Sequence, residues 1–101
     1  MKTTYYLAQH DGCNIYVGKT CVGMPARVQK HRAQCFNEPR PFYKFWQSLQ
    51  DPNELTFAVI SEYECPTHLT RQEWRTIERI TEQGYIDHYQ PLYNARNEIA
   101  Q

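Results

Sequence analysis

An Asp-Gly pair at residues 11–12 sets the strongest local limit on the fold of this chain. It separates two short segments, Thr3–Gln9 and Asn14–Gly18, that are rich in β-branched and aromatic residues. Asp and Gly both tolerate the positive φ angles of a tight two-residue turn, so this pattern predicts a β-hairpin. We expect the hairpin to bring Tyr5 and Tyr16 near each other.

Two helices are predicted after the hairpin. Pro25 is tolerated in the first turn of a helix, and the segment that it opens runs to about Cys35. A second helix begins near Pro41, and its apolar residues follow the spacing i, i+3, i+4 and i+7, which places them on one core-facing stripe. That stripe consists of Phe42, Phe45, Trp46 and Leu49.

A strand and a long helix complete the predicted fold. Residues 55–60 are almost continuously apolar, which predicts a strand covered on both faces. Thr70 and Glu73 form a capping-box pattern, so a helix should start at Thr70, and it must end before Pro91. The residues that we expect on its buried face are Trp74, Ile77, Ile80, Gly84 and Tyr85.

The length of 101 residues fits a single domain, residues 1–101. The expected class is α+β, a small three-stranded, mainly antiparallel sheet flanked by helices in the order ββααβα. A hydrophobic content of 41 % excludes a disordered chain, and the zero net charge excludes a polybasic coat of nucleic acid. The longest apolar runs are too short to cross a membrane, and no signal peptide is visible. We therefore expect a cytoplasmic protein with reduced cysteines.

The zero net charge is the sum of one basic and one acidic segment. Residues 19–44 hold six basic residues and one acidic residue, whereas residues 51–101 hold four arginines and nine acidic residues. Within the basic segment, Arg27, Lys30 and His31 share one face of the predicted helix, which suits an anionic substrate such as a phosphodiester. In the acidic segment, Glu82 lies at the border of the buried stripe of the long helix, and Glu78 is its nearest competitor for a role in a site.

Several of these residues form a recognisable series. Tyr16-Val17-Gly18 is followed directly by Lys19, and Tyr5 lies eleven residues before Tyr16. Arg27 and His31 then form an R-x-x-x-H pattern on the predicted first helix.

The closing part of the series lies near the C-terminus, where residues 82–87 are followed by Pro91-Leu92-Tyr93-Asn94. In this order and spacing, the chain resembles the GIY-YIG nuclease family over residues 3–94. The sequence departs from the family at Thr3-Thr4, where the family usually has Gly-Ile. Two threonines are good strand formers, so the strand itself is still expected.

The resemblance implies hydrolysis of DNA phosphodiesters with a divalent metal. Glu82 resembles the family's metal ligand, and a hard carboxylate suits Mg²⁺ or Mn²⁺. Arg27 would bind the scissile phosphate through its two-pronged guanidinium group. Tyr5 or Tyr16 would accept the proton of the attacking water, which requires nearby cations to lower the phenol pKa.

The other residues of the series have supporting roles by the same resemblance. Lys19 and Lys30 would contact DNA phosphates, and His31 would either hold a phosphate or transfer a proton. Asn94 is grouped with the phosphate-binding residues and is expected to fix the C-terminal loop against the site.

The implied function is that of a compact DNA endonuclease from a phage or mobile element, or a structure-specific nicking enzyme. One active site cuts one strand, so double-strand cleavage would require a homodimer or two sequential nicks. The alternative is an inert regulator with the same fold that binds nucleic acid or a partner. A zinc site at His10, Cys13 and Cys21 is disfavoured because no C-x₂-C pair is present.

Overall fold

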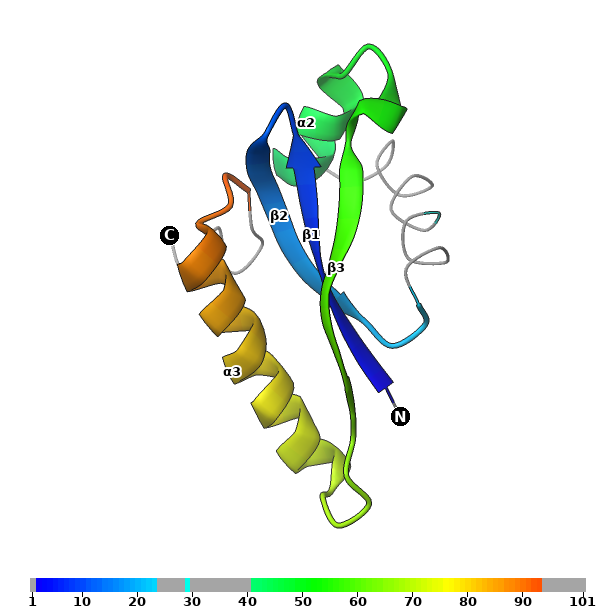
Figure 1. Cartoon of the computed structure of the whole chain (residues 1–101), viewed down its shortest axis with the longest axis vertical. Helices are drawn as coiled ribbons and strands as arrows, with labels where there is room; N and C mark the ends of the chain where they lie inside the picture. The colour runs from blue at the N-terminus through cyan, green and yellow to red at the C-terminus, as the bar shows by residue number, and fades with distance from the viewer. Residues whose placement is uncertain (1, 24–28, 30–40, 94–101) are drawn as a thin grey trace.

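The computed structural model describes residues 2–23, 29 and 41–93. A β-hairpin comes first, followed by a short helix, a single helical turn, a third strand and a long helix (Figure 1). In chain order these elements are β1 (Lys2–His10), β2 (Cys13–Thr20), α2 (Pro41–Ser48), the 3₁₀ turn η1 (Pro52–Glu54), β3 (Thr56–Glu64) and α3 (Arg71–Tyr89).

The predicted α+β class with a three-stranded antiparallel sheet is confirmed. The order of the described elements is ββαβα, which does not match the predicted ββααβα. The difference falls on the helix expected from Pro25 to about Cys35, because nearly all of that segment lies outside the described residues. Within the described part of the chain, no helix is long and apolar enough to cross a membrane.

The Asp-Gly turn forms as the sequence predicts. His10 pairs with Cys13 across it, and Asp11 and Gly12 have φ angles of 52° and 74°. Two positive φ angles in succession characterise the type I′ turn, whose twist matches that of the strands it joins. The hairpin prediction is therefore confirmed in both its strands and its turn.

The register of the hairpin places its two candidate tyrosines on opposite faces of the sheet. Tyr5 pairs with Lys19, whereas Tyr16 pairs with Ala8. Because successive side chains of a strand alternate between faces, Tyr5 and Ala8 point in opposite directions. The expected proximity of Tyr5 and Tyr16 is wrong. The neighbour of Tyr16 is Tyr6, with 6.3 Å between ring centroids.

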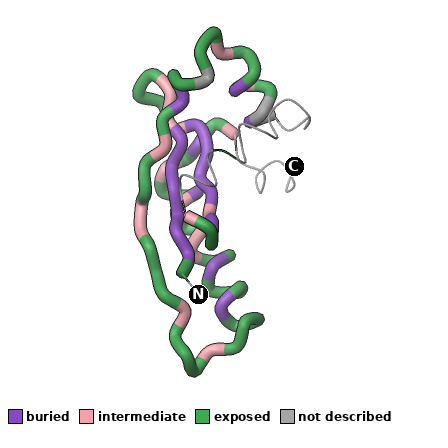
Figure 2. Tube along the Cα trace, turned by 90° about the vertical axis from the view of Figure 1, so that its right-hand side faces the viewer, coloured by how far each residue is buried: buried purple, intermediate pink, exposed green. Residues whose placement is uncertain are grey.

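The strand that is covered on both faces is β1. It lies between β2 and β3, and all its residues from Thr3 to Ala8 are buried. Strand β3 is an edge strand and is mostly exposed, so the prediction that residues 55–60 are covered on both faces is wrong. Figure 2 shows this contrast: burial is concentrated on β1 and β2, while β3 is exposed or half-buried along most of its length. An apolar run alone does not tell a central strand from an edge strand.

Helices α2 and α3 cover opposite faces of the sheet. Phe42 and Trp46 of α2 are buried against one face together with Tyr6 and Tyr16, which confirms the predicted apolar stripe. The cluster on the other face is smaller. It consists of Leu7, Val17 and Ile86, with Ile60, Tyr85 and Tyr89 partly buried around it.

The long helix α3 begins with the predicted capping box. Thr70 Oγ1 accepts a hydrogen bond from the Glu73 amide at 3.1 Å, and Glu73 Oε1 accepts one from the Thr70 amide at 2.9 Å. The predicted buried face of the helix is partly wrong, since Ile77 is 40 % and Ile80 is 66 % exposed. The residues of α3 that are buried are Trp74, Glu78 and Ile86.

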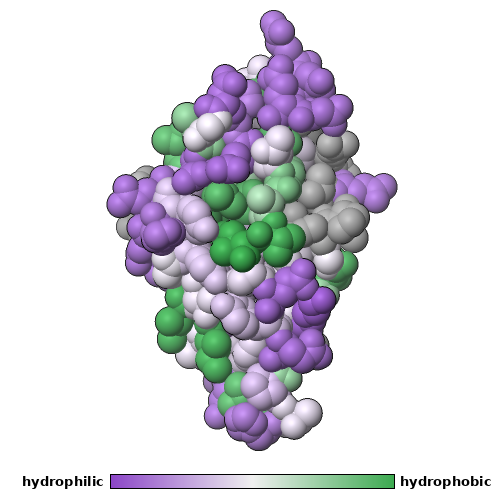
Figure 3. All heavy atoms as spheres, viewed as in Figure 1, coloured by the Kyte–Doolittle hydropathy of each residue, from purple (hydrophilic) through white to green (hydrophobic). Residues whose placement is uncertain are grey.

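Large hydrophobic residues are also exposed on the edge strand. Val59 and Tyr63 of β3 are about half exposed, at 49 % and 48 %. Figure 3 shows hydrophobic residues in the middle of the face seen in Figure 1, with hydrophilic residues towards its ends.

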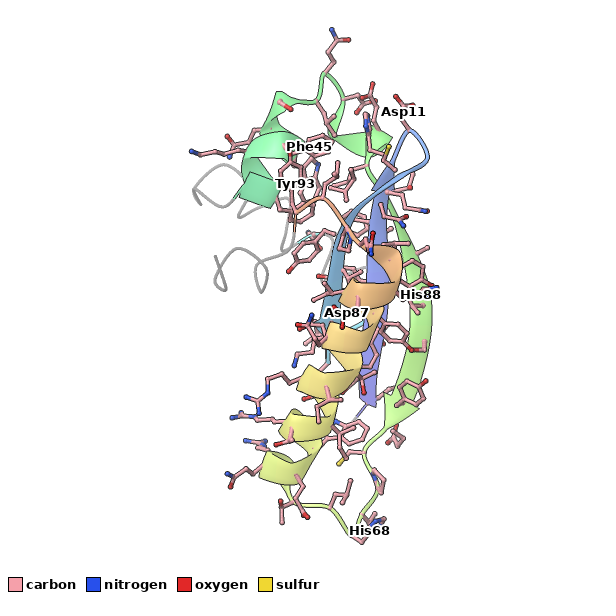
Figure 4. The ribbon with its side chains drawn as sticks, turned by 90° about the vertical axis from the view of Figure 1, so that its left-hand side faces the viewer. Asp11, Phe45, His68, Asp87, His88 and Tyr93 are labelled. Carbon is pink, nitrogen blue, oxygen red and sulfur yellow. The ribbon has the colours of Figure 1, made fainter. Side chains whose placement is uncertain are left out.

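After α3 the chain returns to the outer edge of β2. The amides of Leu92 and Tyr93 donate to the carbonyl oxygens of Asn14 and Ile15 at 3.1 and 2.8 Å. The ring of Tyr93 lies 5.4 Å from that of Phe45, centroid to centroid (Figure 4). The segment just before Asn94 is therefore fixed beside β2 and α2.

Candidate functional site

Tyr5 is buried between the sheet and α3. Its side chain is 1 % exposed, and its hydroxyl donates a long hydrogen bond of 3.4 Å to the main-chain oxygen of Glu78. Its ring packs obliquely against Tyr85, with 5.4 Å between centroids. The pKa of Tyr5 is raised to about 12, chiefly by burial; a hydrogen bond with Thr81 lowers it, and the carboxylates of Glu78 and Glu82 act in the same direction as burial. A phenol with this pKa stays protonated at neutral pH.

Lys19 lies beside Tyr5. It is half-buried on β2, and the register pairs it directly with Tyr5. Directly paired residues of an antiparallel sheet have their Cβ atoms about 4.5–5.5 Å apart on the same face. Lys19 therefore belongs to the face that α3 covers, at the edge of the sheet, where a cationic side chain can reach solvent.

Tyr16 occupies the opposite face. Its ring stacks on Phe42, with 4.3 Å between centroids and 7° between ring planes. Gly18, on the same face, leaves no room for a side chain, because a Cβ atom there would clash with the Tyr6 hydroxyl and lie 2.8 Å from Cε2 of Tyr16. The glycine of the Tyr16-Val17-Gly18 motif is thus required by the packing of two tyrosine rings.

The two glutamates of α3 have different environments. Glu78 is 5 % exposed, and its Oε2 accepts a hydrogen bond from Thr3 Oγ1 at 2.5 Å. Glu82, one turn further along the helix, is partly exposed. Of the two carboxylates, Glu82 is the one that solvent and a solvated ion can reach.

Glu78 belongs to a buried polar chain that crosses from α3 to β1. Trp74 Nε1 donates to Thr3 Oγ1 at 3.1 Å, and the Thr3 hydroxyl donates in turn to Glu78. Thr3 is fully buried, at 0 % exposure. A buried carboxylate is tolerated when hydrogen bonds satisfy it, so this chain explains why a charged residue lies on the inner side of α3.

The sequence predictions did not include this polar chain. A signal was present, because Trp74 and Glu78 are four residues apart and therefore share one face of a helix. The residue that joins them, Thr3, is one of the two that depart from the family pattern.

A second group of hydroxyls lies where α3 meets β3. A hydrogen bond of 2.6 Å joins Ser61 Oγ and Tyr85 Oη. Burial raises the pKa of Tyr85, whereas hydrogen bonds with Tyr85 and then Ser61 lower the pKa of the exposed Tyr63 hydroxyl. The sequence predictions placed Tyr85 on the buried face of the helix but did not include its partners Ser61 and Tyr63, because the pairing of α3 with β3 is not visible in the sequence.

The structure thus brings three of the predicted residues, Tyr5, Lys19 and Glu82, to one side of the sheet and places Tyr16 on the other. The remaining predicted residues lie outside the described part of the chain. These are Arg27, Lys30, His31 and Asn94.

No group of three His, Cys, Asp or Glu side chains that could hold a metal ion occurs among residues 2–23, 29 and 41–93. Mg²⁺ usually keeps several waters and takes only one or two protein carboxylates, so a single accessible carboxylate such as Glu82 fits its chemistry. His10, of the disfavoured zinc site, instead contacts Glu54, with 3.4 Å between Nε2 and Oε2.

Figure 4 shows α3 lengthwise in front of the sheet, with His68 ahead of its first turn and Asp87 and His88 near its end. Glu82 lies between these ends, on a helix that is anchored at its start by Trp74 and Glu78 and near its end by Ile86.

Comparison with known proteins adds no assignment, since no family model, curated protein or solved structure matches this chain.

Proposed function

We propose that this chain is a DNA endonuclease that hydrolyses phosphodiester bonds with the help of Mg²⁺ or Mn²⁺. The observation that carries the proposal is the contrast between the two glutamates of α3. Glu78 is buried and hydrogen-bonded, whereas Glu82, the residue that the motif series selects, is partly exposed. Lys19 and Tyr5 lie on the sheet face that the same helix covers.

Glu82 is the proposed metal ligand. A bound Mg²⁺ would neutralise negative charge that develops on the phosphate during hydrolysis. Lys19 is proposed to contact a phosphate from the edge of the sheet. The proposal also includes the helix from Pro25 to about Cys35, whose Arg27 would hold the scissile phosphate while Lys30 and His31 would contact the strand around it.

The proton acceptor is proposed to be a residue other than the two tyrosines. The pKa of Tyr5, at about 12, keeps that phenol protonated, so Tyr5 is suited to donate a hydrogen bond and to position α3. Tyr16 lies on the other face of the sheet from Glu82 and Lys19, where its ring stacks on Phe42. A general base must reach the water that it deprotonates, so the role falls to His31, for which the resemblance implies a phosphate contact or proton transfer.

The test is a nicking assay. Purified protein is incubated with supercoiled plasmid and with a branched DNA, in Mg²⁺ and in EDTA, beside an Arg27→Ala variant. The proposal predicts open-circular product or branch cleavage only with the wild-type protein and only with the metal. Cleavage that persists in EDTA would contradict the metal role. Binding to DNA without cleavage in Mg²⁺ or Mn²⁺ would instead identify an inert binding protein with this fold.

A further inference from the structure

Three arginines follow one another at intervals of one helical turn on α3. Arg71, Arg75 and Arg79 are all exposed and lie four residues apart. With a rise of about 1.5 Å per residue, neighbouring members are about 6 Å apart along the helix, and the whole row spans about 12 Å. We call these three residues the arginine ridge.

The ridge borders a hollow on the surface of α3. Gln72, Arg75, Thr76 and Arg79 line a pocket of about 230 Å³. Each guanidinium group carries five N–H donors, and the Gln72 amide adds two more. The Thr76 hydroxyl donates to the main-chain oxygen of Gln72 at 3.2 Å. This lining is rich in donors and positively charged, which matches the oxygen atoms of an anion.

Arg71 and Arg75 are not placed to stabilise the helix. Like charges at i and i+4 destabilise a helix by about 0.2–0.5 kcal/mol per pair, and a cation in the first turn, such as Arg71, opposes the helix dipole. Neither Arg71 nor Arg75 forms an ion pair with any other residue in the described part of the chain. Their exposed donors are therefore available to a ligand outside the helix.

The position of the ridge relative to Glu82 indicates what that ligand is. At about 100° per residue, Arg75 and Arg79 project within about 60° of Glu82 around the helix. Arg79 is three residues before Glu82, so the ridge continues along α3 from the proposed metal ligand. One strand of duplex DNA presents a phosphate about every 3.4 Å of helix axis, so arginines about 6 Å apart can each contact a different phosphate of that strand.

We propose that the arginine ridge binds the phosphate backbone of one DNA strand beside the bond that is cleaved. This inference rests on the proposed function, since it assigns a further contact for the same substrate. Three of the four arginines of the acidic segment (residues 51–101) lie in this row, so that segment also presents a local cationic surface.

The test measures binding without cleavage. The affinity for a short fluorescein-labelled DNA duplex is followed by fluorescence anisotropy in EDTA at salt concentrations between about 50 and 200 mM. Each lost phosphate contact reduces the slope of log affinity against log salt by about 0.9. For Arg75→Gln/Arg79→Gln we expect a slope that is smaller by about 1.8 and a weaker affinity at every salt concentration.

Two control variants separate a local contact from net charge. Lys2→Gln/Lys44→Gln removes the same charge from exposed residues of β1 and α2 and should keep the wild-type slope. Arg75→Lys/Arg79→Lys keeps the charge of the ridge and should also keep the slope. Circular dichroism confirms that each variant is folded, which is expected because all the substituted residues are exposed.

The outcomes distinguish the ridge from the proposed function. A wild-type slope in the Arg75→Gln/Arg79→Gln variant overturns the ridge, and Mg²⁺-dependent cleavage by the same protein would leave the nuclease proposal standing. A reduced slope with no cleavage by the wild-type protein supports the ridge and overturns the nuclease proposal. Absence of any DNA binding by the wild-type protein overturns both.

Discussion

Tyr5 is enclosed by groups that favour its neutral form. Burial raises its pKa to about 12, and the two nearby glutamates act in the same direction. Its hydroxyl contacts the backbone of α3 at Glu78, so its effect on a site at Glu82 is exerted through the position of the helix.

Phenylalanine variants test whether either tyrosine accepts a proton. Tyr16→Phe and Tyr5→Phe both keep the packed ring, so each should change the cleavage rate at saturating DNA by less than about 10-fold. The pH–rate profile of each variant should match that of the wild type. A fall of about 10²–10⁴ in either folded variant would identify that tyrosine as the proton acceptor.

The raised pKa of Tyr5 also predicts an alkaline loss of stability. Between pH 10 and about 12 the unfolded chain releases this proton while the folded chain retains it, so the free energy of unfolding should fall as pH rises through this range. The loss of unfolding free energy across this pH range is of order 1–3 kcal/mol. No such loss occurs at neutral pH, where Tyr5 is protonated in both the folded and the unfolded chain. Urea unfolding of wild type and Tyr5→Phe at several alkaline pH values measures it. Parallel curves for the two proteins would contradict the prediction.

Thr3 links α3 to β1 through a buried hydroxyl. Its hydroxyl joins Trp74 to Glu78, and Thr3→Val would leave both partners buried without that bond. We expect a loss of about 1–3 kcal/mol in the free energy of unfolding, measured by urea titration. Thr4→Val is the matched control, because Thr4 is also buried but on the other face of the sheet. An equal loss in both variants would show that the polar chain does not matter.

At the scale of the elements, the two β-strands of the hairpin depend on a close approach at Gly18. A methyl group there would overlap the Tyr6 hydroxyl, so Gly18→Ala should lower the free energy of unfolding by about 1–3 kcal/mol.

Gly84 is the matched control for this substitution. It lies within α3, and a Cβ atom there meets nothing within 4 Å. Gly84→Ala should therefore raise the free energy of unfolding by about 0.5–1 kcal/mol, since alanine favours the helix more than glycine does. Thermal denaturation of both variants measures the two effects, and a stable Gly18→Ala protein would refute the packing argument.

Short sequence motifs correctly predicted the turn and the helix start that depend on a few adjacent residues. The Asp11-Gly12 turn and the Thr70 capping box each depend on a few adjacent residues, and both formed as expected. The inner face of α3 was only partly predicted, because Glu78 is buried through a partner, Thr3, that is 75 residues away in sequence. Apolar periodicity cannot anticipate such a partner, so it favoured Ile77 and Ile80.

At the scale of the whole molecule, the motif series selected the candidate site residues but did not predict which face of the sheet each of them lies on. Counted regularly from its turn, the hairpin would pair Tyr16 with Leu7, on the same face as Tyr5. A register shift between Ala8 and Gln9 pairs Tyr16 with Ala8 instead, on the face of Tyr6, and no sequence signal predicted this shift. Helical periodicity alone did not separate Glu82 from Glu78, since both lie near the border of the buried stripe, and the motif series was the reason for choosing Glu82. Their different exposure depends on how α3 packs on β1.

The most direct test of the account compares the two glutamates. Single-turnover cleavage of DNA in Mg²⁺ is measured for Glu82→Gln and Glu78→Gln at a temperature where circular dichroism shows both to be folded. Glu82→Gln removes the accessible carboxylate and should lower the rate by about 100-fold or more. Glu78→Gln keeps a side-chain oxygen for Thr3 and should stay within about 10-fold of the wild type. Full activity of Glu82→Gln together with an inactive, folded Glu78→Gln would contradict the proposed site.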